Sequence, residues 1–278
     1  MGVLGNSSHL LRRRRETFMD WSKTKTIFIA VFLILDIFLL MVFFNKHSAS
    51  QFEFIQEASI EDKLKSYNIE YEKLPEEVSE ETIITAKTKK FTKKETDRLL
   101  NQTVKLSLNQ LILDSYLQKP FKLGEEKLED MKSFVESDVL FGDQYRYWGM
   151  NDEKNIAIFY QHYDNKKMFE NKNGKLEIKL NNNGEIYAYS QTLLENLEEN
   201  GKSESILSAY QAIETLYKNG LIKPNSKISN VELGYYTVVT ELQVLSPTWY
   251  FKIKNGEKTE RMYVNAFDGS IYRNEENS

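Results

Sequence analysis

The stretch Thr26–Phe44, TIFIAVFLILDIFLLMVFF, is the part of the sequence around which the rest of the chain is organised. It is almost uniformly apolar, and a helix of this length, at about 1.5 Å per residue, spans the hydrocarbon core of a bilayer. The alternatives are a cleaved signal peptide and a buried helix of a soluble protein. Signal peptides have a shorter apolar segment, and a core helix usually carries a polar stripe. The stretch therefore predicts one uncleaved transmembrane helix over residues 26–44.

Basic residues lie mostly ahead of this stretch. They are Arg12, Arg13, Arg14, Arg15, Lys23 and Lys25, whereas only Lys46 and His47 follow closely behind it. The cytoplasmic flanks of membrane helices are enriched in lysine and arginine. The pattern predicts a single-pass protein of the cell membrane, with a cytoplasmic basic tail at 1–25 and an extracellular C-terminal region.

One residue of the apolar stretch is acidic. Asp36 lies at its middle, where an ionised carboxylate costs roughly 2.5–3.5 kcal/mol. On a helix it shares a face with bulky apolar side chains, among them Phe32, Leu33 and Leu40. Ionisable groups inside a membrane usually mark a function, although a protonated Asp without a partner is the simpler alternative. We predict that Asp36, Leu33, Leu40 and Phe32 contact a partner transmembrane helix.

The residues ahead of a second methionine, Met19, have little periodicity. Either residues 1–18 form a genuine basic tail that binds anionic lipid, or translation starts at Met19. We favour a start at Met19, because consecutive arginine codons can read as a purine-rich ribosome-binding signal.

The composition excludes several classes of function. The chain has 278 residues, a net charge of −4 and no cysteine. Disulfides, thiolate metal sites and thiol nucleophiles are therefore excluded. Mild acidity argues against nucleic acid as a partner, because phosphate binding needs a concentrated basic surface. We identify one such basic cluster, the one ahead of the apolar stretch.

No catalytic or metal-binding constellation is found in the sequence. The three histidines, His9, His47 and His162, are scattered. Residues 179–190 loosely resemble a calcium loop, but the first and twelfth positions lack ligands, so we interpret them as a hairpin. Acidic runs at 76–81 and 195–199 are interpreted as solvated surface. We predict no enzyme, no cofactor and no metal.

Beyond a linker at 45–57, the residue pattern predicts an α+β fold of mainly antiparallel sheets with packed helices. Helices are expected at 60–67, where Ser59 and Asp62 form a capping box, and at 92–100, 125–139 and 203–219. Strands are expected at 68–74, 82–91, 104–108, 111–121, around 145, and at 156–163, 176–180, 228–239, 248–253 and 261–264.

Two segments share an order of elements. Residues 124–200 and 201–278 each contain a helix followed by strands, and each includes a hairpin, NGEIY at 183–187 and DGSIY at 268–272. Asn-Gly and Asp-Gly are strong hairpin signals, and hairpin links cannot form parallel crossovers. We predict two similar α+β units, preceded by an N-terminal part of the extracellular region at 58–123.

Aromatic residues are concentrated in the strands of both units. Most should be core, because aromatic side chains favour strands and bury large areas, and the remainder are available for a protein interface. They are Tyr145, Tyr147, Trp148, Phe159, Tyr160, Tyr163, Tyr235, Tyr236, Trp249, Tyr250 and Phe251.

Several motifs together resemble the YycI family. They are MDWSKTKTIF at 19–28, LILD at 33–36, FYQ at 159–161, LGYY at 233–236, QVLSPTW at 243–249 and VNAFDG at 264–269. The resemblance covers Met19 to the C-terminus, which supports a start at Met19, and residues 1–18 depart from the family pattern. It implies a non-enzymatic, membrane-anchored regulator of the WalK (YycG) sensor histidine kinase, acting with YycH largely through transmembrane helices. It implies no catalytic residues.

A second function remains open from the residues alone. The extracellular region could be a ligand-binding or cell-wall-associated sensor domain, with the aromatic residues as its recognition surface. An exported hydrolase has no residues to support it. The sequence leaves open whether a regulator of this kind activates or represses its kinase.

Overall fold

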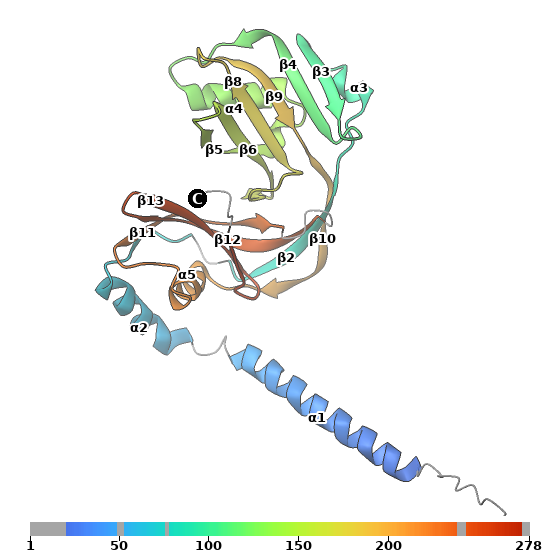
Figure 1. Cartoon of the computed structure of the whole chain (residues 1–278), viewed down its shortest axis with the longest axis vertical. Coiled ribbons are helices and arrows are strands. Elements are labelled where there is room, and N and C mark those ends of the chain that lie inside the picture. Colours follow the sequence, from blue (N-terminus) through green and yellow to red (C-terminus); the bar gives the residue numbers. More distant parts are fainter. Residues whose placement is uncertain (1–20, 49–52, 76–77, 238–242, 274–278) are drawn as a thin grey trace, which may run out of the picture. The chain divides into compact units, whose positions relative to one another are not determined.

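The computed structural model describes residues 21–48, 53–75, 78–237 and 243–273. The chain divides into two compact units, Met1–Glu61 and Asp62–Ser278 (Figure 1). The tail at 1–18 lies outside the described residues. The predicted linker at 45–57 is largely helical, since α1 runs to Ser48 and α2 begins at Glu53, and residues 49–52 lie outside the described part of the chain.

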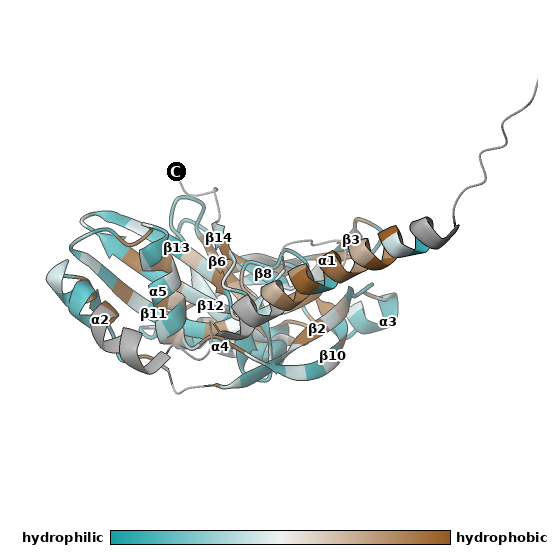
Figure 2. Ribbon diagram, turned by 90° about the horizontal axis from the view of Figure 1, so that it is seen from below, coloured by the Kyte–Doolittle hydropathy of each residue, from teal (hydrophilic) through white to brown (hydrophobic). Residues whose placement is uncertain are grey.

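Helix α1 (Trp21–Ser48) contains the whole apolar stretch and extends past it at both ends. The side chains of residues 25–41 are exposed, and the hydropathy colouring of Figure 2 shows α1 as the most continuously apolar helix. Within the described residues, no helix satisfies the length and apolarity required of a membrane span.

Helix α2 (Glu53–Ser66) begins earlier than the sequence pattern predicted. Ser59 lies inside the helix, so the predicted capping box is wrong. The preceding residues are mostly good helix formers, which explains the earlier start. The helix ends in a Schellman motif, in which Ile69 N donates to Leu64 O at 2.9 Å and Asn68 has a φ of 52°.

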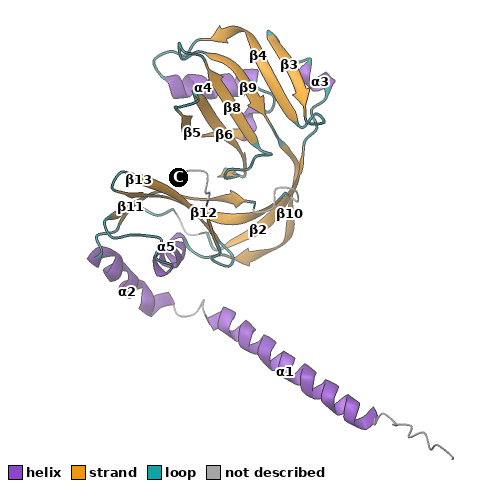
Figure 3. Ribbon diagram, viewed as in Figure 1, coloured by secondary structure: helices purple, strands orange, loops and turns teal. Residues whose placement is uncertain are grey.

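The unit Asp62–Ser278 contains two seven-stranded sheets, which we call sheet I and sheet II (Figure 3). Sheet I has the order β1 (Glu70–Tyr71), β11 (Ser226–Tyr236), β12 (Val244–Asn255), β13 (Lys258–Asn265) and β14 (Ile271–Arg273), with β2 (Glu80–Thr88) beside β12 and β10 (Leu194–Ser205) beside β2. Sheet II has the order β3 (Gln102–Ser107), β4 (Ile112–Phe121), β9 (Ile186–Gln191), β8 (Lys175–Leu180), β6 (Ile156–Tyr163) and β5 (Tyr145–Asn151), with β7 (Lys166–Lys167) beside β6.

The predicted α+β class with mainly antiparallel sheets is confirmed. The strand pairs are antiparallel, with the exception of β1 against β11. Both hairpins are found where Asn-Gly and Asp-Gly predicted them, and Gly184 and Gly269 have φ values of 75° and 74°. Such left-handed angles are readily adopted by glycine, which is why these turns form there.

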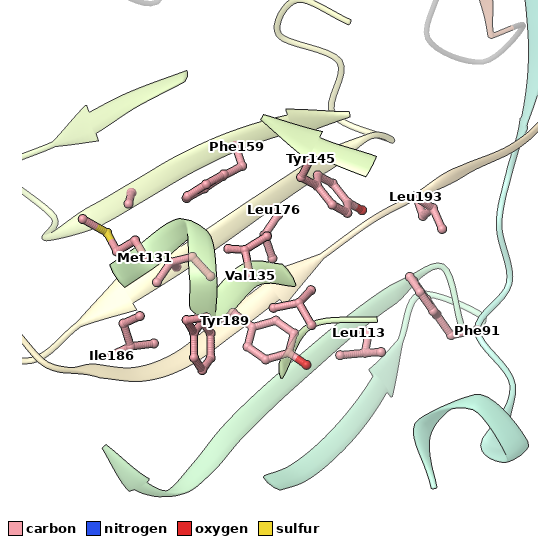
Figure 4. Packing of buried hydrophobic residues seen from close by; sticks show 14 residues of the cluster. Phe91, Leu113, Met131, Val135, Tyr145, Phe159, Leu176, Ile186, Tyr189 and Leu193 are labelled. Carbon is pink, nitrogen blue, oxygen red and sulfur yellow. The ribbon is translucent and has the colours of Figure 1, made fainter. Parts of the chain in front are cut away.

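The core of sheet II lies under helix α4 (Lys127–Asp138). Met131, Phe134 and Val135 of the helix are buried against the sheet, and Figure 4 shows Met131 and Val135 there, whereas Leu128 at the start of the helix is 37% exposed. After α4, the short helix η1 (Gly142–Gln144) folds back closely, and a Cβ on Gly142 would lie 1.7 Å from Val135 O. Only glycine fits at this crossing.

The core of sheet I lies under helix α5 (Ala209–Lys218). The helix starts at a capping box formed by Ser208 and Gln211, so its predicted start at Ser203 is wrong. Residues 203–205 instead continue strand β10, and Ile206 N donates to Ser79 O at 3.0 Å. Trp249 is buried, and its indole Nε1 donates to Leu207 O, just ahead of α5, at 2.7 Å.

The acidic run at 195–199 proves to be part of a strand. Its side chains are mostly exposed, as expected, but its backbone pairs with β2 in sheet I. Charged side chains on such an edge strand discourage pairing with other chains. The segment 58–123 supplies β1 and β2 to sheet I and β3 and β4 to sheet II. The division at 58–123, 124–200 and 201–278, and the repeat, stay predictions.

Candidate functional site: the junction between the two sheets

Six consecutive residues, Lys166–Asn171, connect the two sheets, and we call them the strap. The strap begins as β7, which pairs with β6 of sheet II. Met168 N then donates to Gln161 O of β6 at 2.8 Å, and Phe169 N donates to Tyr235 O of β11 at 2.8 Å. Adjacent residues therefore make backbone hydrogen bonds to different sheets.

Gly234 of β11 makes this close approach possible. A Cβ at this position would lie 2.5 Å from Lys167 O and 2.5 Å from two ring atoms of Phe169. Its φ is not in the left-handed region, so the requirement for glycine here is one of space. An isolated glycine within a strand often marks the approach of another backbone segment.

The ring of Phe169 lies at the centre of an aromatic cluster from three elements. Its centroid is 5.4 Å from that of Tyr250, 5.8 Å from that of Tyr263 and 5.8 Å from that of Trp148. Trp148 belongs to β5 of sheet II and also lies 5.0 Å from Tyr250 of sheet I. A bulge between Tyr147 and Gly149 locally changes the register of β5 at Trp148.

Two cations flank Trp148, and each has an acidic partner. The Arg261 guanidinium lies 5.5 Å from a Trp148 ring centroid and the Lys167 ammonium lies 6.0 Å away, both within cation–π range. Arg261 Nη1 is 3.4 Å from Glu170 Oε1, and Lys167 Nζ is 2.8 Å from Glu232 Oε2. These pairs again join the strap to sheet I.

The phenols of the cluster are protonated at neutral pH. Burial raises the pKa of Tyr263 strongly, and the nearby Glu170 carboxylate raises it further. Burial also raises the pKa of Tyr250 to about 12. Neither group is therefore a nucleophile or a base under physiological conditions.

A second set of polar contacts holds the start and the end of the strap. Lys166 Nζ lies 2.7 Å from Glu81 Oε1 of β2, and Tyr235 donates to the other oxygen of Glu81 at 3.2 Å. At the far end, Asn171 Nδ2 donates to Gln243 Oε1 at 3.3 Å. Successive residues of the strap are thus held by contacts to both sheets. A displacement of one sheet relative to the other would therefore strain the contacts of the strap.

The strand aromatics that the sequence analysis singled out are either buried or part-buried. Of the eleven strand aromatics, seven are buried and the other four, Tyr147, Trp148, Tyr163 and Tyr236, are part-buried. The expectation that most are core is confirmed. What sequence reasoning missed is the strap, although the isolated glycine in the strand pattern LGYY was an available signal.

The predicted contact face of the membrane helix lies on α1. Phe32, Leu33 and Leu40 are 60%, 55% and 53% exposed, and Asp36 is also exposed. All four residues lie on the one helix α1. Their role as a partner contact stays a prediction.

The described residues contain no group of acidic and histidine side chains able to hold a metal ion. His162 Nε2 lies 3.2 Å from Asp143 O, and burial, with a smaller effect of Arg146, lowers its pKa. In the loop at 181–185, Asn181 Oδ1 accepts hydrogen bonds from the backbone N–H groups of Asn183 and Glu185. This is the hydrogen bonding of a hairpin turn, as interpreted from the sequence.

Comparison with known proteins identifies a family. The sequence model of the family described as YycI protein matches residues 49–267. No curated protein matches the chain.

Three solved structures align at low sequence identity. An uncharacterized protein from Eubacterium rectale is 12% identical over 71% of this chain and 86% of that chain, with a TM-score of 0.42. The YpeB C-terminal domain from Bacillus megaterium is 14% identical over 68% and 89%, with a TM-score of 0.40. YycH from Bacillus subtilis is 15% identical over 79% and 61%, with a TM-score of 0.39.

Proposed function

Because the chain belongs to the YycI family, we propose that it is a non-enzymatic regulatory protein that modulates the WalK (YycG) sensor histidine kinase together with YycH. The match of the family model over residues 49–267 is the observation that carries this proposal. The residues of the junction fit a non-enzymatic function, because their hydrogen bonds, ring contacts and ion pairs have the structural role of holding the two sheets together.

The location that fits this function is the cell membrane. Helix α1 would be a single-pass anchor with its N-terminus in the cytoplasm and the two sheets outside the cell. The apolar stretch Thr26–Phe44 and the basic residues ahead of it support this orientation. The exposed apolar side chains of residues 27–41 would then face lipid and partner helices.

Regulation without an active site requires a difference in affinity for two states of the kinase. We place one contact on α1, where Asp36 would hydrogen-bond to a partner helix inside the bilayer. Coupling through contiguous helices is a direct physical route to a cytoplasmic catalytic domain. The extracellular sheets would recruit YycH and set the occupancy of the complex.

The alternative function as an extracellular sensor receives less support. Its expected recognition surface was the set of strand aromatics, and these residues pack in the core and the junction instead. Saturable binding of a cell-wall fragment by the extracellular unit would nevertheless favour it.

Reconstitution tests the proposal. WalK is placed in proteoliposomes alone, with YycH, or with YycH and this chain, and its autophosphorylation rate is measured. The proposal expects a change of rate, in either direction, that needs this chain. An unchanged rate with all three proteins inserted would reject it. A further arm uses the Asp36→Leu variant of this chain, and Ile37→Leu, which keeps the apolar character of α1, is its matched control.

A further inference from the structure

One edge of sheet II is strongly basic, in a chain whose net charge is −4. We call residues Lys89–Lys122, which include α3 (Lys93–Thr96), β3 and β4, the basic edge. The segment contains eight basic and three acidic residues, and seven of the basic side chains are exposed, compared with one acidic side chain, Asp97. The sequence interpretation, which identified a single basic cluster ahead of the membrane helix, missed this one.

The fold brings these residues together along one edge. Phe91 N donates to Gln110 O at 2.9 Å, which joins the start of α3 to the tip of the β3–β4 hairpin. Gln118 N donates to Asn101 O at 2.9 Å, which joins the far end of the α3 segment to β4. Helix α3 therefore lies along β3, as Figure 1 and Figure 3 also show.

The acidic residues of the basic edge are mostly engaged internally. Glu95 closes the capping box with Thr92 and lies 3.0 Å from Lys89 Nζ, which also pairs with Glu195 at 3.1 Å. Asp114 is part-buried and accepts a hydrogen bond from Ser107 at 3.4 Å. The charge presented to solvent is thus carried by Lys90, Lys93, Lys94, Arg98 and Lys105, with Lys119 and Lys122 at the end of β4.

Large apolar side chains are exposed on the same edge. Leu100 is 74% exposed and Leu108 is 66% exposed, and Tyr116 and Phe121 of β4 are also exposed. Leu108 has a φ of 46°, and Asn109 and Gln110 follow with φ values of 57° and 71°. A leucine in the left-handed region costs free energy, so the hairpin tip presents this side chain to solvent at the expense of stability.

Basic side chains combined with exposed leucine and aromatic side chains are typical of surfaces that bind anionic membranes. Lysine at a sheet edge also prevents pairing with other strands, but that role does not require exposed apolar side chains. We propose that the basic edge docks onto a surface of anionic lipid headgroups. The inference rests on the membrane anchoring proposed above, because a tethered domain meets its own bilayer at a high effective concentration.

The test uses the full chain in nanodiscs of neutral phosphatidylcholine, with or without anionic phosphatidylglycerol. The rate of acetylation of each lysine is measured by mass spectrometry. Each lysine that lies close to an anionic surface favours docking of the protein by about fivefold in the equilibrium constant. We expect Lys90, Lys93 and Lys94 to react about fivefold more slowly in anionic discs, and this protection to disappear in about 0.5 M salt.

Two charge-matched variants complete the test. Lys90→Glu, Lys93→Glu and Lys94→Glu together should remove the protection of Lys105. The control replaces three exposed lysines elsewhere, Lys202, Lys223 and Lys227, by Glu and should leave that protection unchanged.

The outcomes separate this inference from the proposed function. Failure of the chain to insert into discs would reject the membrane anchor and the docking surface together. Insertion with equal lysine reactivity in both kinds of disc would reject the docking surface alone. Protection by soluble polyphosphate in neutral discs, without protection by anionic lipid, would assign the edge to a soluble anionic polymer and reject lipid as its partner.

Discussion

Replacing Gly234 by alanine tests the close packing of the strap against sheet I. The added Cβ would lie 2.5 Å from Lys167 O and from the Phe169 ring, so the strap must move. Overpacking of this kind costs about 1–3 kcal/mol, and loss of the hydrogen bond from Phe169 N to Tyr235 O costs about 1 kcal/mol more. Alanine also lowers the conformational entropy of the unfolded chain, and this effect offsets about 0.5–1 kcal/mol of the destabilisation. We expect a net destabilisation of about 2 kcal/mol.

Gly149→Ala is the matched control. Gly149 also lies in a strand without a left-handed φ, and a Cβ there meets no atom within 4 Å. Its free energy of unfolding should stay within about 0.5 kcal/mol of the wild type. The assay is urea unfolding of residues 62–278, followed by the fluorescence of Trp148 in sheet II and Trp249 in sheet I. Equal stability of Gly234→Ala and Gly149→Ala would refute the packing argument.

Four further predictions concern helix α1, the tip of the β3–β4 hairpin and the buried phenol of Tyr263. Asp36→Leu should weaken association with partner helices by about 0.6–2 kcal/mol without loss of insertion, and an unchanged crosslinking signal at equal protein level would reject pairing. A fragment of residues 19–50 should retain part of the regulatory activity in a deletion strain, and a stably inserted but inactive fragment would place control in the sheets. Leu108→Asn should raise the free energy of unfolding by about 0.5 kcal/mol, because asparagine tolerates the left-handed region better, and a decrease would contradict the argument from strain. The free energy of unfolding should fall above about pH 10, because the pKa of Tyr263 is higher in the folded chain than in the unfolded chain. The stabilisation from the protonated phenol is complete below the pKa of the unfolded chain and is lost as the pH rises towards the pKa of the folded chain. In urea titrations, Tyr263→Phe should lose less free energy of unfolding than the wild type between pH 9 and pH 11.

Local signals in the sequence predicted much of the fold. The helix expected at 125–139 corresponds to α4, and the expected strand at 156–163 coincides with β6. The Asn-Gly and Asp-Gly turns were found because their chemistry is local. Each of these features depends on residues that are close together in the sequence.

The sequence-based predictions were wrong or incomplete where tertiary contacts determine the local structure. Strand β10 contains mostly polar and charged residues and shows no apolar alternation, because it is an edge strand whose order comes from pairing with β2. The strap likewise has no periodicity, since it is placed by Gly234, Phe169 and Tyr235, which come together only in the folded chain. Parallel pairing of β1 with β11 joins residues more than 150 positions apart, beyond the reach of local patterns.

The most direct test of the account is the output of the kinase in cells. The phosphorylated fraction of the response regulator that WalK controls is measured in the parent strain, in a strain lacking this chain, and in that strain with the chain restored. The account predicts that deletion changes this fraction, in either direction, and that restoration returns it to the parental value. The same fraction in all three strains, at equal amounts of WalK and YycH, would contradict it.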